Sequence, residues 1–360
     1  MVALSPFLSP LLRRQLARFR RVRRGYYSAL ILLLLLMLSA GAELLVNSRA
    51  LVVRYQGEWF FPTYAAFLPG KVFGFDYAYE TNYRDLQRRI AQQDATHRAR
   101  GLPATGDFVW LPPVPYSPIE NDYVPGRFPP DAPSSTHWLG TDTTGRDILA
   151  RLVYGFRTAM VFSMTLLLCT YAIGISVGCA MGYFSGALDL LGQRLIEVWS
   201  NVPFLYVIMI IASIVVPSFT TLVLLMVLFG WMNLTWYMRT ATYREKSRDY
   251  VLAARALGAG PGRVIFHHVL PNTLSLIVTF APFAIASGIT SLTALDYLGF
   301  GLPPPTPSWG ELLAQGTANL QHSWIVSSVV GAMSAVLLMV TFIGEAVREA
   351  FDPRKFSYYE

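Results

Sequence analysis

Residue clusters that carry out enzymatic chemistry are missing from this sequence. It contains no Gly-x4-Gly-Lys-Ser/Thr phosphate loop and no His-Glu-x2-His zinc pair. The adjacent residues His267 and His268 point to different faces of a helix, which does not favour a shared metal ion. Cys169 and Cys179 lie about 15 Å apart along one expected helix, too far for a disulfide. We expect no catalytic residue, no metal site and no cofactor bound by this chain.

A charged cluster stands just before one of the long apolar runs. Asp142, Arg146 and Asp147 lie close together there. Thr141 or Asp142 can cap a helix that begins near Gly145. The apolar face of this helix would consist of Ile148, Leu149, Leu152 and Val153. We predict a short helix at the membrane surface, with the two aspartates as capping residues and ion-pair partners rather than metal ligands.

A second segment of interest, Tyr250 to Gly258, is polar enough for a loop but lies between long apolar runs. Its small residues Ala253 and Ala254 allow another protein surface to approach a helix closely. Gly258 can end or bend that helix, and Pro271 marks the entry to the next apolar run. This pattern predicts a short exposed helix that docks onto a partner.

The composition indicates that both segments belong to a membrane protein. Hydrophobic residues make up 53% of the chain and charged residues 14%. Five runs without a charged residue are long enough for spans of about 20 residues. They cover residues 25–42, 158–188, 198–238, 264–295 and 312–344. The third run can hold two helices, with a turn at 217–221. We therefore expect an all-α polytopic membrane protein of six helices, the first at 26–46 and five within 158–360.

The N-terminal residues 1–25 set the expected orientation. They contain seven arginines and no acidic residue. They are Arg13, Arg14, Arg18, Arg20, Arg21, Arg23 and Arg24. Because basic segments stay in the cytoplasm, both termini and the loop at 239–271 should be cytoplasmic. The positive charge thus indicates membrane topology and not nucleic-acid binding. A cleavable signal peptide ending near Ala42 is the alternative interpretation of this region.

The segment 47–157 is polar and rich in proline, which predicts a position outside the bilayer, in the periplasm. Residues 51–61 predict two short strands around Gln56 and Gly57, and residues 83–100 predict a charged helix. The aromatic residues between these elements would form a small core or anchor the segment at the membrane. Alternatively, they form a platform for a substrate-binding protein.

Polar and small residues also occur in the apolar runs. Glycine recurs every four residues on the expected second helix, at Gly174, Gly178, Gly182 and Gly186. Such a strip lets helices pack closely, within this chain or against a partner. Glu197 and Asp296 stand near the ends of helices, where a charge costs less than at the membrane centre. We expect ion pairs for both; Asp296 is also a candidate for an external gate or a contact with a peptide amine.

Two motifs resemble the dipeptide, oligopeptide and nickel permeases among the ABC importers. The first is Leu-Gly-Thr-Asp, two residues, Gly-Arg-Asp. The matching residues are Leu139, Gly140, Thr141, Asp142, Gly145, Arg146, Asp147, Arg151, Gly155 and Arg157. The second motif, at 298–310, contains Leu-Gly-x-Gly and Pro-Ser-Trp-Gly. The resemblance extends from about His137 to Pro353. The external insertion and Asp296 are most similar to the Yej-type branch, associated with uptake of microcin C and oligopeptides.

The segment 243–271 resembles the cytoplasmic coupling segment of these permeases. In the family it consists of Glu-Ala-Ala, three residues, Gly, nine residues, Ile, one residue, and Leu-Pro. This chain has Leu252 in place of the glutamate and His268 in place of the isoleucine. The resemblance implies that the ATPase-coupling residues are Ala253, Ala254, Arg255, Gly258, Leu270 and Pro271.

The resemblance implies a type I ABC importer permease in the bacterial inner membrane, without an ATPase site of its own. Its partners would be a homologous permease subunit, one or two ABC ATPase subunits that use ATP and Mg²⁺, and a periplasmic substrate-binding protein. Peptides would pass between the two permeases by alternating access. The periplasmic entrance would be shaped by Asp142, Arg146, Asp147 and Asp296. The alternatives are a secondary active transporter and an ABC permease for nickel or another non-peptide solute.

Overall fold

The computed structural model describes residues 10–123 and 126–351, with side chains from residue 13 onward. These residues form two compact units. The helical unit contains the described residues up to 33, residues 159–303 and those from 333 onward. The mixed unit contains the described residues of 34–158 together with 304–332.

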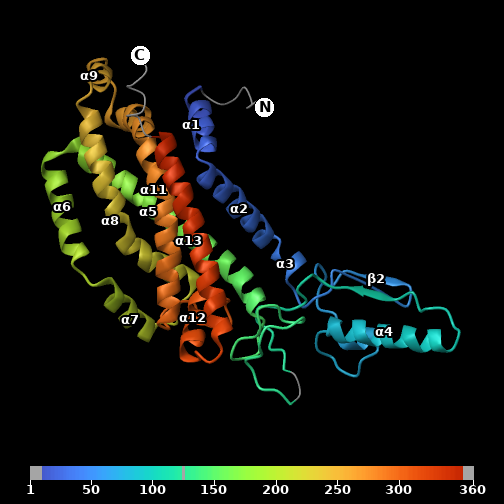
Figure 1. Cartoon of the computed structure of the whole chain (residues 1–360). Coiled ribbons are helices and arrows are strands. Elements are labelled where there is room, and N and C mark those ends of the chain that lie inside the picture. The colour runs from blue at the N-terminus through green and yellow to red at the C-terminus, as the bar shows by residue number, and fades with distance from the viewer. Residues whose placement is uncertain (1–9, 124–125, 352–360) are drawn as a thin grey trace. The chain divides into compact units, whose positions relative to one another are not determined.

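Long helices form from the apolar runs (Figure 1). They are α2 (Arg23–Ala40), α5 (Ile148–Phe184), α8 (Phe219–Lys246), α13 (Ser323–Phe351) and the continuous helix Pro261–Tyr297. The last one consists of α10 (Pro261–Arg263), the π-helical turn η2 (Val264–Val269) and α11 (Leu270–Tyr297). Each of the five is long and apolar enough to cross a membrane. The expected all-α membrane fold is confirmed.

The sixth candidate span consists of two helices. α6 (Gly186–Ser200) and α7 (Phe204–Ile214) meet at an angle of 67° and together pass the same test of length and hydrophobicity. α8 follows after a short turn in which the Ser218 hydroxyl accepts a hydrogen bond from the Thr221 amide. The predicted turn between the third and fourth spans is therefore confirmed. The third span was expected from residue 198, whereas α6 already begins at residue 186.

Two further boundaries differ from the prediction. The expected surface helix near Gly145 does not exist as a separate element, because α5 runs from Ile148 to Phe184 without a break. The last apolar run is divided between α12 (Trp309–Ala318) and α13. Between them, a turn is closed by a hydrogen bond of 2.9 Å from the His322 amide to the Asn319 carbonyl. Apolar composition alone does not reveal such a turn.

Helices α5 and α8 pack closely through glycine. A Cβ atom on Gly178 would lie 2.7 Å from the Met238 Cβ and 2.7 Å from the Thr235 carbonyl oxygen. Gly174 and Gly182 face α8 in the same way. Of the two interpretations of the strip, packing within this chain is confirmed for these three glycines. It is wrong for Gly186, which begins α6 and has no atom within 4 Å of a Cβ position.

The mixed unit holds a three-stranded antiparallel sheet in the order β2-β1-β3. β1 (Val52–Tyr55) and β2 (Glu58–Phe60) form the predicted hairpin, in which Gln56 and Gly57 have φ of 52° and 85°. Such positive φ values at both turn positions match the right-handed twist of the strands. The third strand, β3 (Phe108–Trp110), pairs with β1 and was not expected. The predicted helix is α4 (Tyr83–Ala99), and the Asn82 side chain caps it.

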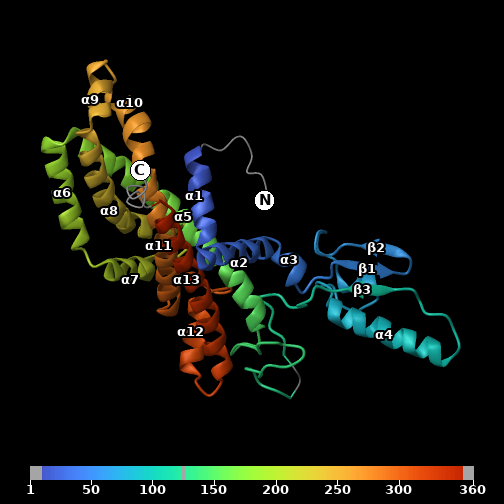
Figure 2. The ribbon, with the colours of Figure 1, turned by 45° about the horizontal axis from the view of Figure 1, so that its top comes forward.

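Helix α4 covers one face of this sheet (Figure 2). Val53, Phe73, Tyr83 and Leu86 form the fully buried centre between them. Phe73, which lies in the short 3-10 helix η1 (Gly70–Phe73), therefore belongs to a buried core, as expected for the aromatic residues of this region. Of the other aromatic residues expected there, Tyr64, Phe67 and Tyr79 remain exposed, whereas Phe75 and Tyr77 are half-buried. Three short helices complete the described elements: α1 (Pro10–Arg21) and α9 (Asp249–Ala256) in the helical unit, and α3 (Ala42–Leu45) in the mixed unit.

Candidate functional site

An exposed short helix lies at one end of the helical unit. α9 (Asp249–Ala256) follows α8 and precedes α10, at the top of Figure 1. Val251 anchors it, packing with Tyr183 at the end of α5 and with Val264 and Val269 of the π-helical turn. The Tyr250 hydroxyl donates a hydrogen bond of 2.5 Å to Glu245 at the end of α8. Burial and this hydrogen bond raise the pKa of Tyr250 to about 12, so its hydroxyl keeps its proton at neutral pH.

The outer side of α9 is open to solvent. Ala253, Arg255 and Gly258 are exposed, and Ala254 is half-buried. Leu257 is 89% exposed and follows directly after the last residue of α9. The sequence interpretation did not single out this leucine, because a single leucine in an apolar chain gives no signal. The exposed surface of small and apolar residues is chemically suited to bind another protein.

Gly258 ends the helix, as predicted. Its φ is 85°, a left-handed conformation that residues with a side chain rarely adopt. The Gly258 amide donates a hydrogen bond of 2.9 Å to the Arg255 carbonyl, and the Ala259 amide donates one of 3.0 Å to Ala254. These bonds satisfy the last carbonyl groups of the helix. The geometry directs the chain away from α9 and leaves its outer side uncovered.

Pro271 stands in the first turn of α11, as predicted, although helical structure also precedes it. The helical stretch already starts at Pro261, and Pro271 lies within it. Because proline has no amide hydrogen, it cannot donate to the His267 carbonyl four residues earlier. The π-helical turn Val264–Val269 directly before α11 accommodates this missing bond. Leu270 packs against the cluster around Cys179, whereas Pro271 is exposed.

A buried ion network lies in the mixed unit. The Arg146 guanidinium contacts Asp142 at 2.7 Å (Nε to Oδ2) and Glu311 at 2.7 Å (Nη2 to Oε1). Arg151, which is fully buried, also pairs with Glu311. Burial lowers the pKa of Arg146, but the charge of Asp142 and the hydrogen bond to Glu311 outweigh it and raise the pKa overall. The group therefore stays charged although it is buried.

The capping residue of α5 differs from the expected one. The Asp147 carboxylate accepts a hydrogen bond of 2.8 Å from the Ala150 amide, so Asp147 caps the helix that starts at Ile148. Asp142 instead closes the preceding turn, where it accepts bonds from the amides of Thr144 and Arg146 at 2.9 and 3.0 Å. The predicted roles of the two aspartates, capping and ion pairing, are confirmed, but the expected cap residue, Thr141 or Asp142, was wrong.

His137 connects two carboxylates beside this network. Its Nδ1 lies 2.8 Å from Asp147 and its Nε2 lies 3.3 Å from Asp122. Burial lowers the pKa of His137, but the hydrogen bonds to Asp122 and Asp147 have the larger combined effect and raise the pKa to about 9. The hydrogen bond from His137 lowers the pKa of Asp122. A protonated His137 is therefore a structural cation of the mixed unit at neutral pH.

The two sequence motifs meet in this unit. The Trp309 indole, at the start of α12, donates a hydrogen bond of 3.0 Å to the Leu152 carbonyl of α5. It packs over Gly155, where a Cβ atom would lie 2.7 Å from the ring. The Ser308 hydroxyl caps α12 and so fixes Glu311 one turn later for its contact with Arg146. Motifs more than 150 residues apart thus build one packed structure.

The residues expected at an entrance are internal to their units. Asp142, Arg146 and Asp147 are 0%, 7% and 2% exposed. Asp296 is 9% exposed and accepts a hydrogen bond of 2.7 Å from the Leu302 amide, which holds the turn after α11. Their side chains therefore maintain backbone structure, and a contribution to an entrance stays a prediction. Glu197 pairs with Arg194 at 2.6 Å, as expected for an ion pair.

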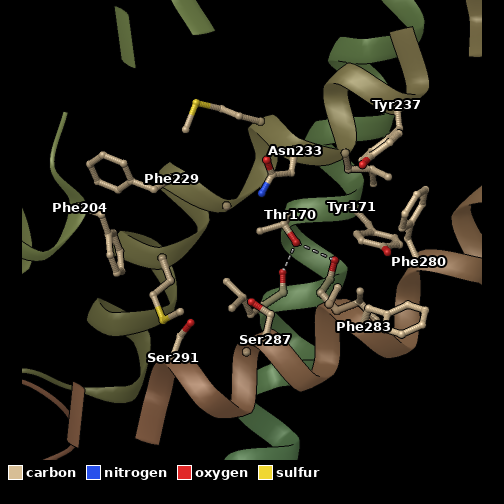
Figure 3. A pocket seen from close by; sticks show the side chains of 18 of the residues that line it. Thr170, Tyr171, Phe204, Phe229, Asn233, Tyr237, Phe280, Phe283, Ser287 and Ser291 are labelled. Atoms are coloured by element: carbon tan, nitrogen blue, oxygen red, sulfur yellow. Dashed lines mark hydrogen bonds between the residues drawn. The ribbon is translucent and has the colours of Figure 1, made fainter. Parts of the chain in front are cut away.

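A cavity of about 520 Å³ lies in the helical unit (Figure 3). Side chains of α5, α7, α8 and α11 line it, together with the link between α6 and α7. The polar lining residues are Thr170, Tyr171, Ser200, Asn233, Tyr237, Ser287 and Ser291. Asn233, Tyr237 and Ser287 are also exposed, so the cavity opens at the surface of the unit.

The lining combines aromatic walls with uncharged polar groups. The rings of Tyr237 and Phe280 lie 4.4 Å apart on one side, while the Thr170 hydroxyl donates to the Leu166 carbonyl at 2.7 Å. None of the described lining residues is charged. Sequence reasoning did not find this site, although Ser287 and Ser291, one helical turn apart in an apolar run, were a visible signal. The cavity can contact polar backbone and apolar side chains without selecting a charge.

One sequence pattern resembles that of a hydrolase but lacks the required structure. Residues 174–178 match Gly-x-Ser-x-Gly, which positions a nucleophile only at a sharp turn between a strand and a helix. Here Ser176 lies in the middle of α5, and its hydroxyl donates to the Ala172 carbonyl at 2.7 Å. The pattern is part of the glycine strip that packs on α8.

The fold and these sites agree with the result of a family comparison. The chain belongs to the family of binding-protein-dependent transport system inner membrane components, whose model matches residues 174–357. It is a membrane permease subunit of an ABC importer.

Individual relatives extend the similarity to nearly the whole chain. The inner membrane ABC transporter permease protein YejE of Escherichia coli K12 is 41% identical over 97% of this chain and 98% of its own length. The peptidoglycan transport system permease protein YejE of Agrobacterium fabrum is 38% identical over 97% and 95%. The dipeptide transport system permease protein DppC of Haemophilus influenzae is 32% identical over 67% and 83%. The match to the two YejE proteins includes the mixed unit.

Proposed function

We propose that this chain is the permease subunit of an ATP-driven peptide importer in the bacterial inner membrane. It would work with a homologous permease, one or two ATPase subunits and a periplasmic binding protein. Its termini and α9 would be cytoplasmic. Peptide is the substrate class because the relatives named for dipeptide and peptidoglycan transport share peptide bonds as their common chemistry. The chain itself would not hydrolyse ATP, because its sequence lacks a phosphate loop.

The exposed surface of α9 is the observation that supports this proposal most strongly. Its small residues Ala253 and Ala254, the cationic Arg255 and the apolar Leu257 all lie outside the hydrophobic cluster that anchors the helix. Because Val251 ties α9 to the end of α5, a push on α9 is transmitted to a helix that lines the cavity. ATP binding and hydrolysis by the partner would thus move the walls of the pathway.

The cavity is the proposed segment of the peptide pathway in this subunit. Its uncharged lining fits a carrier of peptides with different side chains, because a fixed charge would favour one class of peptide over another. Asn233 and the serines of α11 supply hydrogen-bonding groups for peptide backbone. Asn233, Tyr237 and Ser287 are exposed at the opening, and in our proposal a second permease subunit closes the pathway there.

Substitution of Leu257 tests the docking step. Leu257→Asp places a charge on a side chain that is 89% exposed in this chain. The chain should still fold and insert, but the charge would be desolvated and unpaired in a contact with the ATPase subunit. We expect the ATPase to be lost from a pull-down with the tagged permease and solute-stimulated ATP hydrolysis to disappear.

A matched control is available at Leu320, another leucine with 69% exposure, in the turn between α12 and α13. Leu320→Asp should keep the ATPase subunit. Retention of the ATPase by Leu257→Asp, or equal loss in both variants, would contradict the assignment of α9 as the docking helix.

A further inference from the structure

A strongly basic hollow lies where α1 ends and α2 begins. Its volume is about 510 Å³, and its lining consists of Arg18, Arg21, Val22, Arg23, Arg24 and Glu349. Among the described residues, four guanidinium groups thus surround the hollow together with one carboxylate. Guanidinium groups bind phosphate oxygens through charge-assisted hydrogen bonds. The lining therefore has the chemistry of a site for a phosphate-bearing anion.

Close contact between α2 and α13 gives the hollow its form. A Cβ atom on Gly25 would lie 2.7 Å from the Phe342 carbonyl oxygen, so only glycine permits the two helices to approach this closely. The Arg24 guanidinium lies 6.0 Å from the centre of the Phe342 ring. This approach brings Glu349, two turns further along α13, to the edge of the arginine cluster. Arg21 and Arg23 are exposed and thus accessible to a ligand.

An apolar stripe continues from the hollow along α2. Tyr27, Leu30 and Ile31 are 59%, 45% and 50% exposed. They lie on one face of the helix, and Tyr27 is four residues after Arg23. α2 is long and apolar enough to cross a membrane. A cluster of cations at its first turn, followed by an uncovered apolar face, matches a ligand with a charged head and a hydrocarbon tail.

We propose that this hollow binds one anionic phospholipid. Arg21 and Arg23 contact its phosphate, and an acyl chain lies along Tyr27, Leu30 and Ile31. Free phosphate would use the guanidinium groups alone and leave the stripe uncovered, so the structure favours the lipid. The bound lipid connects α1 to the first turn of α2.

Lipid retention by the purified full-length chain tests this proposal. The chain in uncharged detergent is titrated with phosphatidylglycerol or phosphatidylcholine, and the bound lipid is measured by native mass spectrometry. We expect one tightly held phosphatidylglycerol and no equivalent binding of phosphatidylcholine. The double substitution Arg21→Gln and Arg23→Gln should weaken phosphatidylglycerol binding about tenfold or more. Leu30→Ala with Ile31→Ala should weaken it as well, because part of the acyl contact is removed.

The control variant carries Arg14→Gln and Arg20→Gln, which remove two exposed arginines of α1 that do not line the hollow. It should keep its affinity within about twofold. Equal weakening in both arginine variants would overturn the proposal in favour of diffuse attraction. Inorganic phosphate that displaces the lipid at equal concentration would show a free-anion site instead. Loss of the ATPase subunit from the Arg21 and Arg23 variant, with lipid binding unchanged, would show a protein contact.

Discussion

Gly258 is the residue for which the sequence pattern, the backbone geometry and the proposed docking function agree best. Its positive φ ends α9, and the space around it is empty in the isolated chain. A side chain at this position would therefore not collide with the permease itself. It would project into the volume that the proposed ATPase subunit occupies.

A charged side chain at Gly258 should uncouple the complex. In Gly258→Asp, an unpaired charge buried in the contact costs about 3 kcal/mol, which weakens ATPase binding about hundredfold. Membrane insertion should be unchanged. Gly258→Asn has nearly the same shape and backbone strain without the charge, so it should keep more of the ATPase in a pull-down. Equal ATPase retention by wild type and Gly258→Asp would exclude Gly258 from the contact.

His137 makes the stability of the mixed unit dependent on pH. Its pKa of about 9 in the fold lies above the ordinary value of 6.5. The stabilisation, on the order of 3 kcal/mol, is therefore complete below about pH 6.5 and is lost as the pH rises through 9. Asp122 acts in the opposite direction: because its pKa is lowered, its contribution is present above 3.8 and is lost in acid.

Thermal unfolding of the full-length chain from pH 6 to pH 10 measures this effect. The melting temperature should fall across the range for the wild type, and less steeply for His137→Gln. The control is His97→Gln, at an exposed histidine of the same unit, which should keep the wild-type slope. An unchanged slope in His137→Gln would contradict the assignment of His137 as a structural cation.

At the scale of elements, the contact between α5 and α8 depends on glycine. Gly178→Leu would insert a side chain where a Cβ atom alone lies 2.7 Å from Met238 and from the backbone of Thr235. Overpacking of this kind costs about 1 to 3 kcal/mol. We expect a lower yield of folded permease, measured by size-exclusion chromatography. Gly331 on α13 is exposed, and a Cβ atom there would meet no atom within 4 Å, so Gly331→Leu should keep its yield. Normal folding of both variants would show that the glycine strip is incidental.

Local sequence patterns predicted helices and strands correctly where their secondary structure is uninterrupted. The hairpin at Gln56 and Gly57 followed from turn chemistry, and the spans followed from apolar length. The four-residue glycine spacing failed at Gly186 because Ser185, with φ of 55°, interrupts the helix. Spacing places residues on one face only while the helix continues. The 67° bend between α6 and α7 falls at Pro203, a helix-breaking residue that the sequence interpretation did not use.

The candidate sites were predictable only in part, for a related reason. α9 is a local feature, so Ala253 and Gly258 could be identified from sequence. Arg146 has a local partner in Asp142, but its second partner, Glu311, is 165 residues away, and no local pattern relates these two residues. The cavity combines residues from several helices, and it exists only after those helices pack. Contacts between distant segments thus account for most of what sequence reasoning missed.

For the whole molecule, we propose that ATP hydrolysis by the partner ATPase subunits moves the helices of this chain. The purified subunit alone should therefore release no phosphate from Mg-ATP. Hydrolysis should appear only when the ATPase subunits are added, and solute with binding protein should increase it. ATPase activity that still co-purifies with the single chain, after contaminating ATPases have been removed, would contradict the assignment.

The most direct measurement of the central claim is the energy source of transport. The complete complex is reconstituted into liposomes with binding protein and a labelled peptide on one side and Mg-ATP on the side of α9. Uptake should require hydrolysable ATP, persist when ionophores collapse the proton and sodium gradients, and disappear in Leu257→Asp but not in Leu320→Asp. Peptide uptake driven by a proton or sodium gradient without ATP would show a secondary transporter and contradict this account.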